Sequence, residues 1–259
     1  MRTLMILLIA AVTCSAQAPT PEALYGQAMN KLTGAGVSRN DLTGIDLMTK
    51  AAEQGYAPAQ IALGTIYEKG ITVTAEPNRA ATWYGKAADN GDHLAEYLLG
   101  RMYHTGEISR GNTLAEKWLK ESAQAGNPFA AYLYAVSVYD RDPATGLRWF
   151  REAAEQGLPQ AQFRLGKALL EGRGKAVDRQ NAYQWLYVAH EAGVSQAATG
   201  LNEIEGALGS TEIEKIKSQA RELQTRVRRA NVAKGCTGWE GEFDATPTVP
   251  PLEIQRYCE

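Results

Sequence analysis

The sequence contains few of the residues that usually carry metal or cofactor chemistry. Its 259 residues include three histidines and three cysteines. The histidines, His93, His104 and His190, are far apart, none lies in a His-Glu-x-x-His motif, and no Cys-x-x-Cys pair is present. Zinc sites are built from ligands at such short spacings. We therefore expect neither a metal ion nor a cofactor.

Signatures of catalysis are missing as well. There is no Gly-x-Ser-x-Gly motif, which would place a serine nucleophile on a sharp turn. The stretch Gly172–Lys175 reads Gly-Arg-Gly-Lys and has neither the spacing nor the Ser or Thr of a phosphate-binding loop. Glu and Asp are plentiful, but on helices most carboxylates lie on solvated faces. The sequence therefore predicts a protein that is not an enzyme.

The charge is nearly balanced. Lys and Arg number 27, Asp and Glu number 29, and the formal net charge is -2. Proteins that bind nucleic acid usually carry a strong basic excess or a basic stripe. The balance therefore argues against a nucleic-acid partner.

Long apolar runs are also missing, apart from a short one near the N-terminus. Met1 and Arg2 precede an apolar run, Leu4–Val12, which is too short to cross a bilayer and is placed like the centre of a secretory signal. We expect residues 1–16 to be removed after Ala16 and the product to be periplasmic or secreted. A lipid anchor on Cys14 is the alternative.

The sequence does contain a repeated pattern of small and large residues. A motif of the form Ala-Ala-x-x-Gly, or a close variant of it, returns five times at intervals of 31 to 36 residues. We call its last residue the repeat glycine; these are Gly55, Gly91, Gly126, Gly157 and Gly193. A period of this length is typical of a helical solenoid.

Other positions stay in phase with the repeat glycine. The large residues eight positions before it are Leu47, Trp83, Trp118, Trp149 and Trp185, and the small residues four positions after it are Ala59, Ala95, Ala130, Ala161 and Ala197. Small residues at helical spacing let two helices approach closely while large ones fill the space between them. Each unit is therefore predicted to be a helical hairpin in which the glycine ends one helix. Such hairpins must stack to bury their apolar faces.

The segment from Trp83 to Gly106 shows the pattern most fully: Trp-Tyr-x-Lys-Ala-Ala-x-x-Gly-x-x-x-Ala-x-x-x-Leu-Gly-x-x-Tyr. It resembles the Sel1-like repeat, a relative of the tetratricopeptide repeat, and the resemblance covers roughly residues 40 to 206. It implies an all-α fold, a right-handed α-solenoid of helical hairpins.

The pattern divides the chain into five segments. These are 1–16, the signal peptide; 17–40, a linker and a capping helix; 41–206, the repeat solenoid; 207–234, a C-terminal capping helix; and 235–259, a tail. Within them we expect helices at Pro21–Leu32 and Asp41–Gln54, the second one capped by Asp41.

A longer helix is predicted at Thr211–Arg229. Its apolar seam is Ile213, Ile216, Ala220, Leu223 and Val227. The seam either covers the open end of the solenoid or forms a coiled-coil dimer, and its two short heptads favour the first interpretation. We expect a monomer when the protein is free.

The tail from residue 235 has Gly, Pro and aromatic residues without a helical period. A disulfide between Cys236 and Cys258 would close it, contributing on the order of 3 kcal/mol in the chain-entropy model. Two interpretations stay open: a stapled tail that packs on the cap, and a loop that contacts a partner.

The analogy with tetratricopeptide repeats implies a concave face lined by the first helices of the hairpins. The residues expected to contact another protein there lie in three rows, each of which takes one position from successive repeats. They are Ile61, Tyr97, Tyr132 and Phe163 in the first row, Arg101 and Lys167 in the second, and Glu68, His104 and Tyr139 in the third. Aromatic residues beside cations resemble interface hot spots. For Ile61, Tyr97, Tyr132 and Phe163, packing within the repeat is an equally good interpretation, whereas Arg101, His104, Tyr139 and Lys167 are not required by the repeat and favour binding.

The resemblance implies an exported, non-catalytic scaffold that binds another protein. One such role is a periplasmic immunity protein that neutralises a secreted toxin, for example a phospholipase effector. The alternatives are an envelope adaptor or signalling regulator, and a cell-wall-binding or hydrolytic enzyme.

Overall fold

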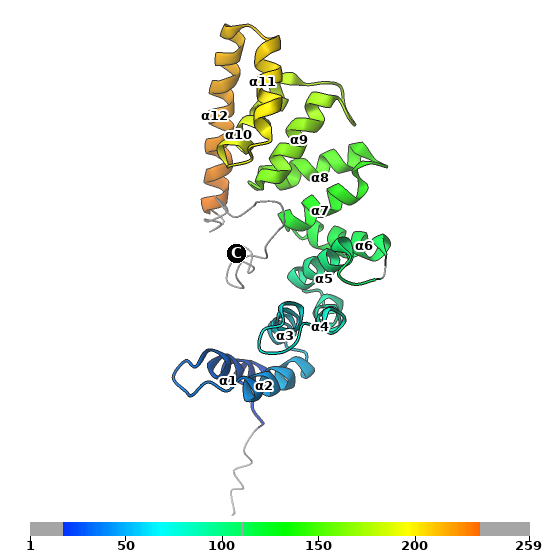
Figure 1. The fold of residues 1–259 in the computed structure, drawn as a ribbon, viewed down its shortest axis with the longest axis vertical. Coiled ribbons are helices and arrows are strands. Elements are labelled where there is room, and N and C mark those ends of the chain that lie inside the picture. The colour runs from blue at the N-terminus through cyan, green and yellow to red at the C-terminus, as the bar shows by residue number, and fades with distance from the viewer. Residues whose placement is uncertain (1–17, 110, 234–259) are drawn as a thin grey trace, which may run out of the picture. The chain divides into compact units, whose positions relative to one another are not determined.

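The computed structural model describes residues 18–109 and 111–233, and these residues form twelve helices and no strand. The helices are α1 (Pro21–Thr33), α2 (Asp41–Glu53), α3 (Ala57–Lys69), α4 (Pro77–Asp89), α5 (His93–Thr105), α6 (Asn112–Gln124), α7 (Pro128–Tyr139), α8 (Pro143–Glu155), α9 (Pro159–Glu171), α10 (Arg179–Glu191), α11 (Ala197–Ala207) and α12 (Ser210–Ala233) (Figure 1). Two compact units are present: one ends at Gln60 and the other begins at Ile61. The predicted all-α class is confirmed.

The repeat glycines end helices, as predicted. They follow α2, α4, α6, α8 and α10 within two residues, and their φ angles lie between 82° and 97°. Glycine adopts this left-handed conformation without the steric cost that a Cβ brings. These five helices are therefore the second helices of five hairpins, whose first helices are α1, α3, α5, α7 and α9.

The cap of α2 differs from the prediction. Asn40, not Asp41, is the N-cap: its φ is -151°, and its side chain accepts a hydrogen bond from the Thr43 amide at 3.0 Å. Asp41 already belongs to the helix and forms an ion pair with Arg39 at 2.7 Å. The prediction was wrong because both residues can cap a helix and the sequence does not show which one has the extended backbone that a cap needs.

From α4 to α10, each helix packs mainly on its neighbours in sequence. Small residues of the first helices lie against large residues of the second helices. A Cβ built on Gly100 would lie 2.9 Å from Leu119 Cγ, and one on Gly166 would lie 2.8 Å from Leu186 Cγ. A side chain larger than that of glycine would clash at these positions because the two helices are in contact there. This is the hairpin packing that the sequence predicted.

Helix α12 packs against α10. The seam residues Ile213, Ile216, Ala220, Leu223 and Val227 are all buried. Beside the seam, Gln219 Oε1 accepts hydrogen bonds from Gln180 at 2.8 Å and Gln184 at 3.2 Å. The apolar seam is therefore occupied by packing within the chain.

The loop between α3 and α4 holds Thr72 at a φ of 63°, the one positive value among the described residues other than glycine. The corresponding position of the α9–α10 loop is Gly174, with a φ of 82°. A β-branched residue pays about 1–2 kcal/mol for this conformation. We expect Thr72→Gly to raise the free energy of unfolding by about 0.5–1 kcal/mol in a urea titration, because glycine's larger unfolded-state entropy offsets part of the gain.

The neighbouring Thr74 provides the control, since its φ is not positive. Thr74→Gly should lower the free energy of unfolding by about 0.5–1 kcal/mol. Equal effects of the two substitutions would contradict the strain at Thr72.

The predicted signal peptide, Cys14, Cys236 and Cys258 lie outside the described residues. Among the helices that are described, none has the length and apolar character needed to cross a membrane.

Candidate functional site

The nine residues predicted to contact a partner lie on four first helices of the second unit, and the structure separates them into two groups. Ile61 and Glu68 lie on α3, Tyr97, Arg101 and His104 on α5, Tyr132 and Tyr139 on α7, and Phe163 and Lys167 on α9. Ile61, Tyr97 and Arg101 are buried. The other six keep part of their surface exposed.

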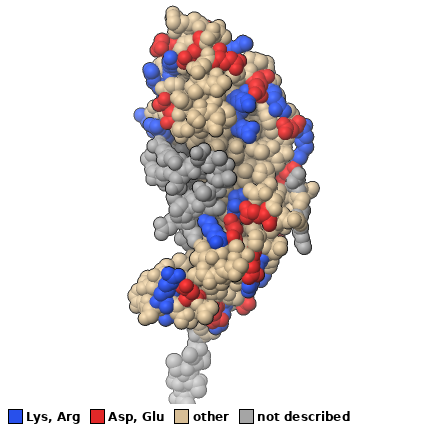
Figure 2. Space-filling view, in the orientation of Figure 1, with Lys and Arg blue, Asp and Glu red and all other residues tan. Residues whose placement is uncertain are grey.

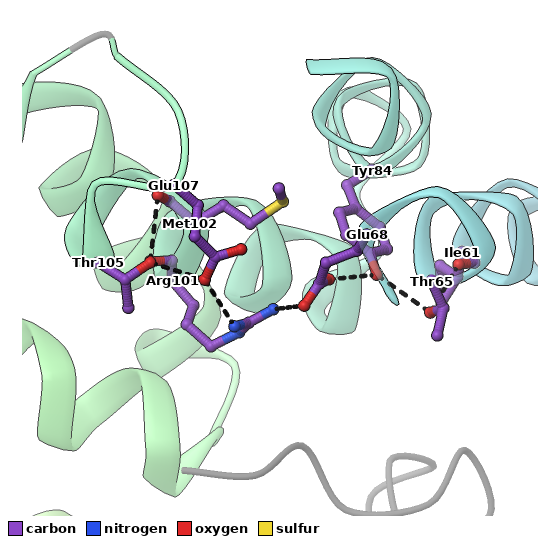
Figure 3. Close-up of polar contacts among 8 residues, drawn as sticks. All are labelled: Ile61, Thr65, Glu68, Tyr84, Arg101, Met102, Thr105 and Glu107. Carbon is purple, nitrogen blue, oxygen red and sulfur yellow. Dashed lines mark hydrogen bonds and ion pairs between the residues drawn. The ribbon is translucent and has the colours of Figure 1, made fainter. Parts of the chain in front are cut away.

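Arg101 and Glu68 form the centre of a buried polar network (Figure 3). Arg101 Nη2 donates to Glu68 Oε1 at 2.5 Å, and their side chains are 6% and 10% exposed. Arg101 Nη1 donates to Glu107 Oε1 at 3.2 Å. From α4, Tyr84 Oη donates to Glu68 Oε2 at 2.8 Å. The network therefore joins two consecutive hairpins.

Two threonines extend the network (Figure 3). The Thr65 hydroxyl lies 3.0 Å from Tyr84 Oη and donates to the Ile61 carbonyl at 3.0 Å. At the other end, Thr105 Oγ1 donates to Glu107 Oε1 at 2.9 Å. We call Thr65, Glu68, Tyr84, Arg101, Thr105 and Glu107 the inter-repeat network. Each member has a hydrogen bond. Thr65, Tyr84 and Arg101 are buried and the Glu68 side chain is 10% exposed, whereas Thr105 and Glu107 are exposed. The buried members hold the hairpins in register.

Arg101 and Tyr84 of the network, and Tyr97 beside it, each stay in one protonation state around neutral pH. Burial would lower the pKa of Arg101, but Glu68, Tyr97 and Glu107 raise it and prevail. Burial, assisted by Glu68, raises the pKa of Tyr84 well above its usual value. Burial also raises the pKa of Tyr97 to about 12. A group that transfers protons in catalysis needs a pKa near the working pH, and these three groups do not have one.

Arg101 and Glu68 therefore form an internal ion pair and do not contribute their charges to a surface for a partner. Arg101 is 5% exposed and is not positioned to meet a partner. Residue spacing did not reveal the pair because its members lie 33 positions apart, in different repeats and different rows of the predicted face. The pair could have been predicted from the sequence, because Glu68 and Arg101 carry opposite charges in adjacent rows of consecutive repeats.

Five of the predicted residues outside the network keep exposed surface: His104 on α5, and Tyr132, Tyr139, Phe163 and Lys167 on α7 and α9. We call the last four the α7–α9 face. The Tyr132 and Tyr139 rings lie 5.9 and 5.4 Å from the ring of the buried Phe150 of α8. Packing on α8 thus holds the two tyrosines in place while each residue stays partly exposed.

Charges border the α7–α9 face. Lys167 is 53% exposed, with its Nζ 3.6 Å from Glu171 Oε1, and the Arg173 guanidinium lies 4.8 Å from the centre of the Tyr139 ring. On the side of the molecule that Figure 2 shows, basic and acidic side chains are interspersed. A single-sign field of the kind that nucleic acid requires is not seen on that side.

The other histidine and carboxylate positions do not assemble a metal site. Within the residues that the structure describes, no group of three or more His, Cys, Asp or Glu side chains could hold a metal ion. Burial lowers the pKa of His104, which favours its neutral form at neutral pH.

The stacked hairpins and the network between them define a helical-repeat scaffold. The Sel1 repeat family matches residues 21–56, 57–92, 93–127, 129–158 and 159–194. The chain belongs to the Sel1 repeat family. The match begins at residue 21, so α1 and α2 together form the first repeat, and the repeats start about 20 residues earlier than the pattern in the sequence predicts.

Relatives share the repeats. Chitin synthase regulatory factor 3 of Schizosaccharomyces pombe is 32% identical over 147 residues, 53% of this chain and 16% of that protein. The Sel1 repeat protein of Oxalobacter formigenes has a solved structure with a TM-score of 0.62 at 28% identity, over 68% of this chain and 75% of that one. The antigen c5321 of uropathogenic Escherichia coli has a TM-score of 0.71 at 22% identity, over 88% of this chain and 50% of that one.

The chain spans about a third or less of the length of the first curated relatives that it matches.

Proposed function

We propose that this protein is a non-catalytic scaffold that binds another protein through the α7–α9 face. The supporting observation is a difference between equivalent positions. Ile61 and Tyr97 are buried, but Tyr132 and Phe163, in the same row, stay partly exposed. Packing of the repeat therefore does not require all of this aromatic surface to be covered.

The chemistry of the face suits a protein partner. Partly exposed tyrosine and phenylalanine side chains offer a large contact area at a small cost in side-chain entropy. Lys167 adds a cation at the edge, where it can steer an acidic partner surface. Tyr132 and Tyr139 are held by Phe150, so less freedom is lost when a partner binds.

Two finer roles fit such a scaffold. One is an adaptor or regulator, which the name of the Schizosaccharomyces pombe relative, a chitin synthase regulatory factor, supports. The other is an immunity protein that neutralises a secreted toxin such as a phospholipase effector, which requires a rigid surface and no active site. Export to the periplasm or beyond belongs to this proposal and rests on the apolar run at residues 4–12.

Capture of a partner from the source cell's envelope and secreted fractions tests the function. We expect the immobilised wild-type protein to retain a specific protein, and the double variant Tyr132→Ala with Lys167→Glu to bind that protein at least tenfold more weakly. Loss of one aromatic hot spot and reversal of one charge account for this magnitude. Isothermal titration with the purified partner measures the change.

The matched control is Lys120→Glu, on the exposed surface of the second helix α6. It changes the net charge as Lys167→Glu does, and it should leave affinity unchanged. Equal affinity of the double variant and the wild type would contradict the proposed face. Release of a modified product from a captured small substrate, rather than a stable complex, would favour the enzymatic alternative.

A further inference from the structure

Helix α5 contains a buried carboxylate that the proposed function does not use. Glu96 is 5% exposed, and it lies five positions after its repeat glycine. The residues at the same place in the second and fifth repeats are glutamines, Gln60 and Gln162, and both are buried. The third repeat therefore has a titratable glutamate at the position where two other repeats have the neutral, isosteric glutamine.

The two glutamines make the same hydrogen bond. Gln60 Nε2 donates to the Ala52 carbonyl at 3.0 Å, and Gln162 Nε2 donates to the Ala154 carbonyl at 3.2 Å. In each case the acceptor lies eight residues earlier, in the last turn of the preceding second helix. The side chain therefore ties the start of a first helix to the end of the helix before it.

Glu96 makes a different contact. The carbonyl that corresponds to Ala52 and Ala154 is that of Ala88. All three carbonyls accept the amide of the repeat glycine that follows, at 3.1, 3.0 and 2.8 Å for Ala52, Ala154 and Ala88, so the junctions differ only in the side-chain bond. An ionised carboxylate has no proton to donate to a carbonyl. Glu96 Oε2 instead lies 3.0 Å from His93 Nδ1 on its own helix.

The surroundings of Glu96 favour its protonated form. Burial raises the pKa of its carboxyl above the usual value, and Glu121 of α6 and Asp92 in the α4–α5 turn raise it further. His93, which is 60% exposed, lowers it and does not prevail. Protonation of Glu96 is therefore easier in the folded chain than in the unfolded one.

We propose that Glu96 makes the α4–α5 junction a proton-dependent contact. When Glu96 takes up a proton, its carboxyl donates to the Ala88 carbonyl and makes the bond that Gln60 and Gln162 make at every pH. When it loses the proton, the carboxylate turns to His93 and the junction loses that tie. Acidification thus tightens this junction and leaves the α2–α3 and α8–α9 junctions unchanged.

The sign of the pH dependence follows from linkage. An acid whose pKa is higher in the folded state stabilises that state most below its unfolded pKa, near 4.5. This contribution is lost as the pH rises through the folded pKa. The wild-type protein should therefore lose stability from this site as the pH goes from about 4.5 toward neutral.

Glu96→Gln tests the proposal, because glutamine can donate to the Ala88 carbonyl at all pH values. Thermal unfolding should show a Tm higher than that of the wild type by about 2–4 °C at pH 7.5, and the difference should shrink toward zero at pH 4.5. Hydrogen exchange of the Gly91 and Asp92 amides, corrected for intrinsic rates, should slow in the variant at pH 7.5.

The reverse substitution provides an independent test. Gln162→Glu should create at the α8–α9 junction the pH-dependent exchange that Glu96→Gln removes at the α4–α5 junction. A Glu96→Gln variant that is less stable than the wild type at pH 5–7 would show that the His93–Glu96 ion pair prevails, and would overturn the proposal. So would pH-independent exchange at the junction of the Gln162→Glu variant.

Discussion

Replacing Gly64 by alanine is expected to lower the free energy of unfolding by about 3 kcal/mol. A Cβ at this position would lie 2.4 Å from Tyr84 Cε1 and 2.6 Å from Cδ1. The ring cannot move aside easily, because it is 1% exposed and its hydroxyl is held by Thr65 and Glu68. Overpacking a fixed core site costs about 1–3 kcal/mol or more, and the loss of the Tyr84 hydrogen bonds adds to it.

Gly85 provides the matched control, because it also lies inside a helix but its nearest neighbour is Leu99 Cδ2 at 3.9 Å. Alanine there meets no obstacle and improves helix propensity by up to about 1 kcal/mol. Urea denaturation of the two variants should give shifts of opposite sign. A stabilised Gly64→Ala variant would show that Tyr84 is free to move.

Replacing Arg101 by methionine is the second change with a large expected effect. It leaves the Glu68 carboxylate, 10% exposed, without its cation. Removing one partner of a buried ion pair typically costs about 3–5 kcal/mol. Urea denaturation should show a loss of this size, and hydrogen exchange should increase at the ends of α3 and α5.

Two further variants separate the contribution of the ion pair to stability from the contribution of Arg101 packing. Adding Glu68→Gln to Arg101→Met removes the stranded charge and should recover at least about 1 kcal/mol. Arg141→Met breaks the ion pair with Glu116, in which Arg141 is 58% exposed, and should cost less than about 1 kcal/mol. If Arg101→Met costs no more than Arg141→Met, the inter-repeat network does not stabilise the fold as described.

The repeat frame could be predicted from the sequence because it depends on local geometry. A glycine that ends a helix and a small residue that faces a large one act over a few residues or across one hairpin, so their spacing is visible in the chain. Gly100 against Leu119 and Gly166 against Leu186 confirm this. The choice of Asn40 over Asp41 as a cap could not be predicted, because it depends on backbone angles that both residues tolerate.

The candidate site could be predicted only in part, for a different reason. The first helices and the rows of the face followed from the frame. The exposure of a residue within a row depends on which neighbouring side chains cover it. Tyr84, on a second helix, donates a hydrogen bond to Glu68, and Glu68 forms an ion pair with Arg101. Such contacts join residues 16 and 33 positions apart. The candidate face is therefore formed by residues of α7 and α9, and not by residues of all four first helices as the sequence predicted.

The packing of helices α4 to α10 on their sequence neighbours has a consequence for how the chain folds. Contacts of this kind close short chain segments, so the entropy lost in forming each of them is small and assembly can start at any hairpin. A destabilising substitution in one hairpin lowers the stability of the adjoining hairpins first. It affects distant hairpins only through the hairpins that lie between. A scaffold built in this way can gain or lose a unit during evolution while the rest of its architecture survives.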